Sequence, residues 1–320
     1  MTEPLMEVTR LGVTAGGTRL VEDLDLTVHR GERLALVGES GSGKSVTARA
    51  LMRLDPGLRL SGSVRFAGEE LLAKSEAEMR RVRRDSMGMV FQDPLGSLDP
   101  LMTVGEQVAE PLRLGGLSKK AARVRAVEVL DELGVANAAT RAGGYPHEFS
   151  GGMRQRVVIG IALAAEPELL IADEPTTALD VRVQEQVLTL LDRVSRERGL
   201  TVLLITHDLG IVAGFADRVA VMYAGRKVHD DPVGATFAGP AHPYTAGLLT
   251  AVPRIDRRPR RLTTIPGAPP HPRHRPAAAC AFAPRCPHRK EVCGVEIPPA
   301  RPTTAGGSVA CHVYGTEVFA

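Results

Sequence analysis

The stretch GESGSGKS, from Gly38 to Ser45, limits the fold of this chain more than any other feature. It fits the pattern G-x-x-x-x-G-K-[ST] and lies between the apolar run RLALVG, which begins at Arg33, and the helix-forming segment SVTARALMRL. A strand, a glycine-rich loop and a helix in this order form a phosphate-binding loop, or P-loop. We therefore expect an α/β protein that binds a nucleotide.

Each part of the P-loop has an expected role. The glycines let backbone N–H groups face the phosphates, and the N-terminus of the following helix adds partial positive charge. Lys44 brings a full charge to the outer phosphates, and Ser45 is an expected ligand of Mg²⁺. The predicted nucleotide contacts of the loop are Gly38, Glu39, Ser40, Gly41, Ser42, Gly43, Lys44, Ser45 and Val46.

Two further apolar runs have the character of strands covered on both faces: ELLIAD, from Glu168 to Asp173, and LTVLLITHD, from Leu200 to Asp208. Between them, the apolar residues at 187, 190, 191 and 194 recur at helical spacing, with Gly199 as a stop signal. The order strand, helix, strand predicts right-handed crossovers and a mainly parallel sheet.

Polar residues follow the predicted strands at the edge where a parallel sheet carries its ligand. Asp173 is expected to orient Mg²⁺, and Glu174 to deprotonate the attacking water. Gln92 in MVFQDP and His207 in LLITHD each end an apolar run, and we expect both to sense the γ-phosphate. Gln92 is also a predicted Mg²⁺ ligand.

A second candidate phosphate-binding motif is FSGGMRQR, Phe149 to Arg156, where a serine and two glycines precede a helical pattern. It closes a segment, about residues 94–156, whose pattern is helical rather than alternating. Ser118 is an expected N-cap within this segment, and Gly134 is expected to end the same helix. We interpret residues 94–156 as a mainly helical insertion.

Composition changes near Pro253. Twelve of the 23 prolines lie beyond residue 250, together with eleven Lys or Arg against four Asp or Glu. A basic tail of this kind is either a solvated surface or a site for an acidic partner, a lipid or a nucleic acid. We predict two domains, 1–252 and 253–320. The N-terminus lacks an apolar signal segment, and no apolar run approaches the roughly 20 residues that cross a bilayer. We expect a cytosolic chain unless a partner holds it at a membrane.

All four cysteines lie in the tail, at Cys280, Cys286, Cys293 and Cys311. Disulfides are not expected in a cytosolic protein. Four thiolates in a proline-rich segment suit a structural metal, because such a segment buries little apolar surface of its own. The spacing alone leaves zinc, an iron–sulfur centre and unligated thiols open.

Taken in order, these motifs resemble the nucleotide-binding subunits of ABC transporters over residues 1 to about 225. The resemblance rests on the P-loop, the Q-loop residue Gln92, the signature Ser150-Gly151-Gly152, the Walker B pair Asp173 and Glu174, the D-loop TALD ending at Asp180, and the switch His207. It implies a P-loop NTPase core of RecA-like type, with a mainly parallel sheet, an antiparallel β portion near the N-terminus and a helical subdomain. It also implies that Ser150, Gly151, Gly152 and Asp180 contact nucleotide, the signature gripping the ATP of a partner subunit arranged head to tail.

Further stretches resemble the C-terminal extension of oligopeptide and dipeptide permease ATP-binding subunits: HPYTAGLL (His242 to Leu249), IPGAPP (Ile265 to Pro270) and CAFAPRC (Cys280 to Cys286). The resemblance implies an ATP-hydrolysing importer subunit for oligopeptides or dipeptides, peripheral on the cytoplasmic face of the cell membrane. Its implied partners are a homologous ATP-binding subunit in a heterodimer, two transmembrane permease subunits and, indirectly, an extracellular binding protein. No nucleic-acid partner is expected. The resemblance also favours a [4Fe–4S] cluster over zinc at the four cysteines.

The chain departs from the family pattern at two positions: Met153 replaces a common signature glutamine, and Ala15 stands where an aromatic residue usually stacks on adenine. One alternative is an importer ATPase for nickel or another small solute. A second is a non-transport ABC ATPase acting on DNA or ribosomes. The sequence disfavours this second alternative. The chain has no sustained heptad stretch, as a coiled coil would need, and it holds one P-loop and one signature rather than two of each.

Overall fold

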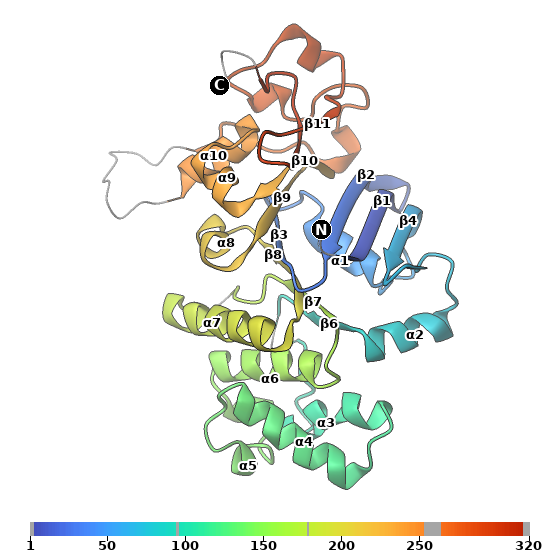
Figure 1. The fold of residues 1–320 in the computed structure, drawn as a ribbon, viewed down its shortest axis with the longest axis vertical. Coiled ribbons are helices and arrows are strands. Elements are labelled where there is room, and N and C mark those ends of the chain that lie inside the picture. The colour runs from blue at the N-terminus through green and yellow to red at the C-terminus, as the bar shows by residue number, and fades with distance from the viewer. Residues whose placement is uncertain (1–2, 94–95, 178, 253–263, 316–320) are drawn as a thin grey trace. The chain divides into compact units, whose positions relative to one another are not determined.

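The computed structural model describes residues 3–93, 96–177, 179–252 and 264–315. The chain divides into two compact units, each assembled from separate stretches (Figure 1). The first unit comprises Met1–Glu3, His29–Glu32 and Ala73–Ile205. The second comprises Pro4–Val28, Arg33–Leu72 and Thr206–Ala320.

A parallel sheet forms the core of the first unit, in the order β8-β7-β6. Its strands are β6 (Met87–Val90), β7 (Leu169–Asp173) and β8 (Thr201–Thr206). Every residue of β7 and β8 is buried, which explains why both are continuous apolar runs in the sequence. The two strands predicted from the apolar pattern are confirmed.

Helices make up the rest of the first unit. They are α2 (Glu76–Asp85), α3 (Val104–Leu114), α4 (Lys119–Glu132), α5 (Ala138–Arg141), the 3₁₀ turn η1 (Pro146–Glu148), α6 (Gly151–Leu163) and α7 (Val181–Arg198). Ser118 caps α4 by accepting from the N–H of Ala121, as predicted, and α7 ends at Gly199 in the left-handed conformation. The described part of the segment predicted as a helical insertion contains helices joined by turns and no strand; residues 94 and 95 lie outside the described residues, and its limits stay a prediction.

The second unit holds the antiparallel sheet expected near the N-terminus, in the order β2-β1-β4-β5. These strands are β1 (Pro4–Ala15), β2 (Thr18–His29), β4 (Arg59–Phe66) and β5 (Glu69–Glu70). The same unit contains a run of strands in the order β11-β12-β10-β9-β3. They are β3 (Arg33–Val37), β9 (Arg218–Tyr223), β10 (Arg226–Pro232), β11 (Ala300–Pro302) and β12 (Ser308–Ala310). β3 and β9 pair in parallel and the others antiparallel, so the mixed α/β class is confirmed.

The helical elements of the second unit are α1 (Lys44–Leu51), α8 (Leu209–Phe215), α9 (Val233–Ala238), α10 (Pro243–Ala251), η2 (Pro272–His274), η3 (Ala283–Arg285) and η4 (Glu291–Gly294). The predicted boundary between residues 252 and 253 falls beside residues 253–263, which lie outside the described residues, and stays a prediction. The C-terminal strand β12 pairs with β10, placing Val309 opposite His229. The described part of the extension is therefore built into the second unit.

Candidate nucleotide site

The P-loop connects β3 to α1 in the second unit, as its sequence predicts. Gly38 has φ of 153°, and a Cβ atom there would lie 2.2 Å from the carbonyl oxygen of Met222. Gly43 has φ of 104° and occupies the N-cap position of α1. Both positions require glycine because of this backbone conformation, and at Gly38 also because of the close approach of β9.

Lys44 is buried at the start of α1, with 5% of its surface exposed. Its Nζ donates hydrogen bonds to the carbonyl oxygens of Gly38 at 2.7 Å and Glu39 at 3.0 Å. The N–H of Ser42 donates to the same oxygen of Glu39 at 3.1 Å. The backbone of the P-loop thus fixes the ammonium group of Lys44. The carbonyl oxygen of Glu39 binds two of the residues predicted to contact nucleotide, Ser42 and Lys44.

The Walker B pair lies where β7 ends, in the first unit. Asp173 is buried, and Glu174 has a left-handed backbone with φ of 48°, a strained conformation for a residue with a side chain. The N–H of Glu174 donates to the carbonyl oxygen of Ile205 at 2.9 Å. The strained backbone therefore lies at Glu174, the residue predicted to activate water.

The carboxylate of Glu174 has two described side-chain donors. The Nε2 of Gln92 donates to Oε2 of Glu174 at 3.0 Å, and the Oγ1 of Thr177 donates to the same atom at 3.0 Å. The structure therefore brings together two residues that lie 82 positions apart in the sequence. Thr177 is the first residue of the D-loop TALD, but the motif predicts no contact between it and Glu174.

His207 follows β8 and is exposed, in the second unit with the P-loop. The next residue, Asp208, caps α8 by accepting from the N–H of Gly210 at 2.7 Å. The cap fixes where the chain turns out of β8. The cap therefore also fixes the backbone position of His207, the residue just before it.

The signature residues begin α6 in the first unit, as expected. Ser150 is the exposed N-cap, and Gly151 and Gly152 form the first turn. A Cβ atom on Gly152 would lie only 2.5 Å from Cγ1 of Val183 at the start of α7. Asp180 caps α7 by accepting from the N–H of Val183 at 3.0 Å. The signature and the D-loop aspartate therefore stand at two neighbouring helix N-termini, where backbone N–H groups suit an anion.

Comparison with known proteins decides the family. An ABC transporter family model matches residues 21–177, and a model of the C-terminal region of oligopeptide/dipeptide transporters matches residues 231–293. Oligopeptide transport ATP-binding protein OppD of Salmonella typhimurium is 49% identical over 313 residues, which cover 96% of this chain and 93% of that protein. The chain belongs to the ABC transporter ATP-binding family.

Other relatives agree with this membership. A protein of Brucella abortus named as a putative peptide import ATP-binding protein is 49% identical over 317 residues, covering 97% of this ABC chain and 95% of the relative. Among solved structures, the dimeric ATP-binding cassette MJ0796 in a post-hydrolysis state with ADP and Pi is similar with a TM-score of 0.64 at 30% identity. That alignment covers 71% of this chain and 98% of the cassette. CbiO1 from Clostridium perfringens, part of the ABC transporter complex cbiONQ, gives a TM-score of 0.66 at 28% identity, covering 74% and 91%.

The four cysteines of this ABC chain are free thiols in the extension; Cys293 and Cys311 are buried, and Cys280 and Cys286 are half-buried. The pKa of Cys286 is raised to about 11, mainly by burial and also by the nearness of the other three sulfurs, against a backbone hydrogen bond from His288 that lowers it. Burial likewise raises the pKa values of Cys280 and Cys311. The thiols are neighbours, but within the described ranges no three His, Cys, Asp or Glu side chains are arranged to hold a metal ion. The predicted iron–sulfur ligation is therefore not shown by the geometry.

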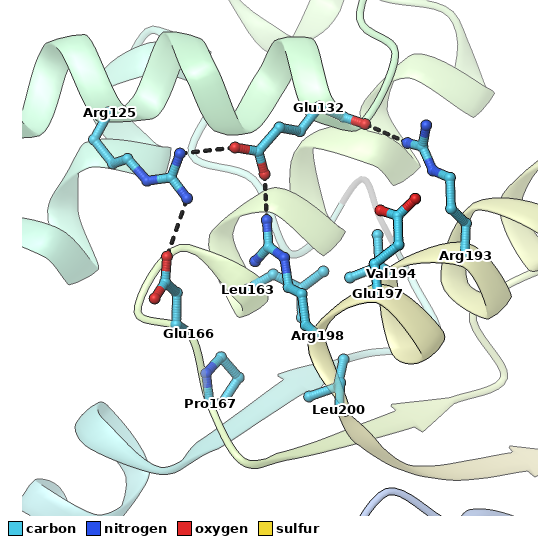
Figure 2. Close-up of a pocket in the computed structure, with 10 residues that line it drawn as sticks. All are labelled: Arg125, Glu132, Leu163, Glu166, Pro167, Arg193, Val194, Glu197, Arg198 and Leu200. Carbon is cyan, nitrogen blue, oxygen red and sulfur yellow. Dashed lines mark hydrogen bonds and ion pairs between the residues drawn. The ribbon is translucent and has the colours of Figure 1, made fainter.

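A cavity of about 600 Å³ opens in the first unit, and none of the predicted site residues lines it. Figure 2 shows that charged side chains from α4, α7 and the turn after α6 meet there. Arg125 donates to Glu132 at 2.7 Å and to Glu166 at 3.1 Å, Arg198 pairs with Glu132, and Arg193 donates to the backbone oxygen of Glu132 (Figure 2). These bonds pair Arg125 and Arg198 with carboxylates across the cavity, so we interpret it as a structural junction between helices.

Proposed function

We propose that this chain hydrolyses ATP to drive the import of oligopeptides or dipeptides, as one energy-coupling subunit of an ABC importer. The observation that supports peptide as the cargo is the similarity to named peptide-transport proteins over at least 96% of the chain, including the C-terminal region at residues 231–293. The observation that supports hydrolysis is the strained, hydrogen-bonded Glu174 that follows a buried Asp173.

The roles follow from the chemistry of the side chains. Lys44 and the N–H groups of Gly38 to Ser45 bind the β- and γ-phosphates. Glu174 accepts a proton from the attacking water, while Gln92 holds the carboxylate in place and His207 contacts the γ-phosphate. Ser45 and Asp173, with Gln92, are the side chains suited to hold Mg²⁺, which neutralises charge on the phosphates when bound.

We propose that each ATP is held between two subunits. Ser150, Gly151 and Gly152 at the start of α6 then bind the γ-phosphate carried by the partner, and Asp180 lies next to them at the start of α7. A heterodimer with a homologous ATP-binding subunit is the proposed assembly. Loss of the γ-phosphate after hydrolysis removes the shared contact and lets the subunits separate.

The helical part of the first unit suits contact with membrane subunits. Leu101 is 85% exposed and Leu114 is 65% exposed, and a bound membrane subunit would cover these apolar side chains. Among the described residues no helix has the length and apolar character needed to cross a bilayer. We propose that two transmembrane permease subunits hold this chain at the cytoplasmic face of the membrane, with an extracellular binding protein supplying the cargo.

We also propose a [4Fe–4S] cluster on Cys280, Cys286, Cys293 and Cys311, with zinc as the alternative. The support is the donor set, since four thiols lie near one another in a segment with little apolar core of its own. Anaerobic purification followed by iron and zinc analysis tests this. A colourless protein free of iron would remove the cluster, and one that also lacked zinc would leave four free thiols.

The test of the proposed function is the complex itself. The chain is co-expressed with its membrane subunits, purified in lipid nanodiscs, and assayed for ATPase activity with the binding protein loaded with short peptides or with Ni²⁺. We expect peptide-loaded binding protein to raise the turnover several-fold and Ni²⁺ to leave it unchanged. Stimulation by Ni²⁺ alone, or failure to purify with any membrane subunit, would contradict peptide import.

A further inference from the structure

The side chain and backbone of Glu39, the second residue of the P-loop, are held by the C-terminal extension and by α10. The N–H of Glu39 donates to the phenol oxygen of Tyr244 at 2.8 Å. The carboxylate of Glu39 receives two hydrogen bonds from Arg285, at 2.6 and 2.9 Å. These partners lie 205 and 246 residues away in the sequence, and neither takes part in the nucleotide chemistry described above.

We propose that Tyr244 and Arg285 are positioning residues of the nucleotide site, and that through Glu39 the extension sets the geometry of the P-loop. The inference rests on the proposed role of the P-loop in binding ATP. It gives a role in nucleotide binding to α10 and the extension, which contain no phosphate-binding motif.

Tyr244 is fully buried, and its local sequence fixes its direction. His242 caps α10 by accepting from the N–H of Tyr244 at 3.0 Å, and Pro243 occupies the first turn. The ring of Tyr244 packs against Tyr223 at 4.6 Å and Phe282 at 5.4 Å between centroids. The sequence His242-Pro243-Tyr244 thus aims one hydroxyl group at the backbone of the P-loop.

Arg285 is held as firmly. Only 5% of its side chain is exposed. Its Nε donates to the carbonyl oxygen of Pro266 at 2.9 Å, and the guanidinium also reaches the carbonyl oxygen of Ile265 at 3.4 Å. A planar guanidinium with this many fixed acceptors presents two parallel donors to Glu39, a geometry that lysine cannot reproduce.

Three family-like stretches of the sequence therefore converge on one residue. Tyr244 belongs to the first stretch, Ile265 and Pro266 to the second, and Phe282 and Arg285 to the third. Glu39 in turn presents its carbonyl oxygen to Lys44 and to the N–H of Ser42. The contacts form a continuous chain from the extension to the lysine that binds phosphate.

Two physical effects follow from this chain of contacts. A loop held in its binding conformation loses less entropy when the nucleotide binds, so the competent fraction of the protein is higher. Arg285 also neutralises a carboxylate that stands within an anion-binding loop, and an unpaired Glu39 would repel the phosphates. Loss of Arg285 should weaken binding through both effects.

The chain offers a matched control in Arg275. This arginine also lies in the extension, has 4% of its side chain exposed, pairs with the carboxylate of Glu22 and donates to the carbonyl oxygens of Arg19 and Ala224. It touches no residue of the P-loop in the contacts described for it. Arg285→Met and Arg275→Met therefore each remove an almost fully buried guanidinium, and the two ion pairs differ in where they end.

The experiment measures binding of a fluorescent ATP analogue with Mg²⁺, and steady-state ATP hydrolysis, for the full-length chain. We expect Arg285→Met to raise both the dissociation constant and KM about tenfold, as when the competent fraction falls to roughly a tenth, with kcat changed less than about twofold. Arg275→Met should bind like the wild type. In the Arg285→Met background, Glu39→Gln should recover part of the affinity, because it removes the unpaired charge.

Tyr244→Phe keeps the inference testable if Arg285→Met does not fold, since it removes one oxygen atom and keeps the ring packing. We expect about a threefold loss of affinity from it. Normal binding by both Arg285→Met and Tyr244→Phe, while Lys44→Ala loses binding, would overturn the inference and leave the proposed function intact. Binding unaffected by Lys44→Ala would remove the proposed function, and this inference with it.

Discussion

The Nε2 atom of Gln92 donates a 3.0 Å hydrogen bond to Oε2 of Glu174, which ties the residue after β6 to the carboxylate after β7. Two strands that pair in parallel thus deliver an amide and a carboxylate to one point. This contact links the residue proposed to activate water to a residue proposed to sense the γ-phosphate.

Glu174→Gln should bind ATP within about twofold of the wild type and lower kcat by about 100-fold or more, because an amide cannot accept the proton of water. ATP binding and single-turnover hydrolysis measure the two effects separately. Thr177→Ala is the matched control, since it removes a partner of the carboxylate but keeps the base, and should cost about tenfold or less. Wild-type turnover in Glu174→Gln would assign the base to another residue.

The two signature glycines should differ in their tolerance of a methyl group. A Cβ atom at Gly152 would lie 2.5 Å from Val183, whereas one at Gly151 would lie 3.6 Å from Leu179, an ordinary contact. We expect Gly152→Ala to lower the free energy of unfolding by about 1–3 kcal/mol and Gly151→Ala to leave it nearly unchanged. Urea denaturation of both variants checks this. Equal stabilities would mean that α6 and α7 approach less closely than described.

Stability should fall in acid because of His242. Burial, together with the neighbouring His229 and against a hydrogen bond to the backbone of Ala310, lowers its pKa from the ordinary 6.5 to about 3. Burial also lowers the pKa of His229, although the hydrogen bond and charge of Asp231 raise it. Because the pKa values of both histidines are lowered in the folded chain, the unfolded chain binds more protons once the pH falls below about 6.5. The stability is present above that pH and is lost as the pH falls towards 3.

His242→Asn keeps an N-cap acceptor for α10 but does not titrate. We expect the drop in unfolding free energy between pH 7 and pH 5 to be about 1–2 kcal/mol smaller in this variant than in the wild type. The size follows because a group that binds its proton only in the unfolded chain costs about 1.4 kcal/mol of stability for each pH unit below its unfolded pKa. Denaturant titrations at the two pH values provide the measurement. A drop of the same size in both proteins would show that His242 is solvated or already protonated.

Local signals in the sequence predict much of the fold. The P-loop, the buried strands β7 and β8, the Ser118 cap and the Gly199 stop each depend on neighbouring residues, so they can be inferred from a short window. The left-handed backbone of Glu174 cannot, because a glutamate has no local preference for it, and tertiary packing imposes it.

The basic tail shows the same limit for long-range contacts. Composition alone describes its arginines as surface charge or as a site for an acidic partner. Arg275 and Arg285 are instead buried, and their acidic partners are Glu22 and Glu39 of the same chain. Arg275 lies 253 positions from Glu22, and Arg285 lies 246 positions from Glu39. Counts of charged residues contain no information about such long-range pairs, so only the three-dimensional structure reveals them.

The central claim is that one chain supplies half of each ATP site, and mixing two inactive variants tests it most directly. Lys44→Ala removes the phosphate-binding charge, and Ser150→Arg blocks the exposed signature at the start of α6. The test uses conditions under which two copies of the wild-type chain pair with each other and hydrolyse ATP. Each variant alone should then be nearly inactive. A mixed dimer regains one site, with the P-loop of the Ser150→Arg chain facing the signature of the Lys44→Ala chain.

The measurement is the ATPase rate of the equimolar mixture after subunit exchange. We predict recovery to about a quarter of the wild-type rate, because about half of randomly paired dimers are mixed and each carries one intact site. A mixture that stays as inactive as its two components, with subunit exchange verified, would show that each chain builds its catalytic site alone and would contradict the account.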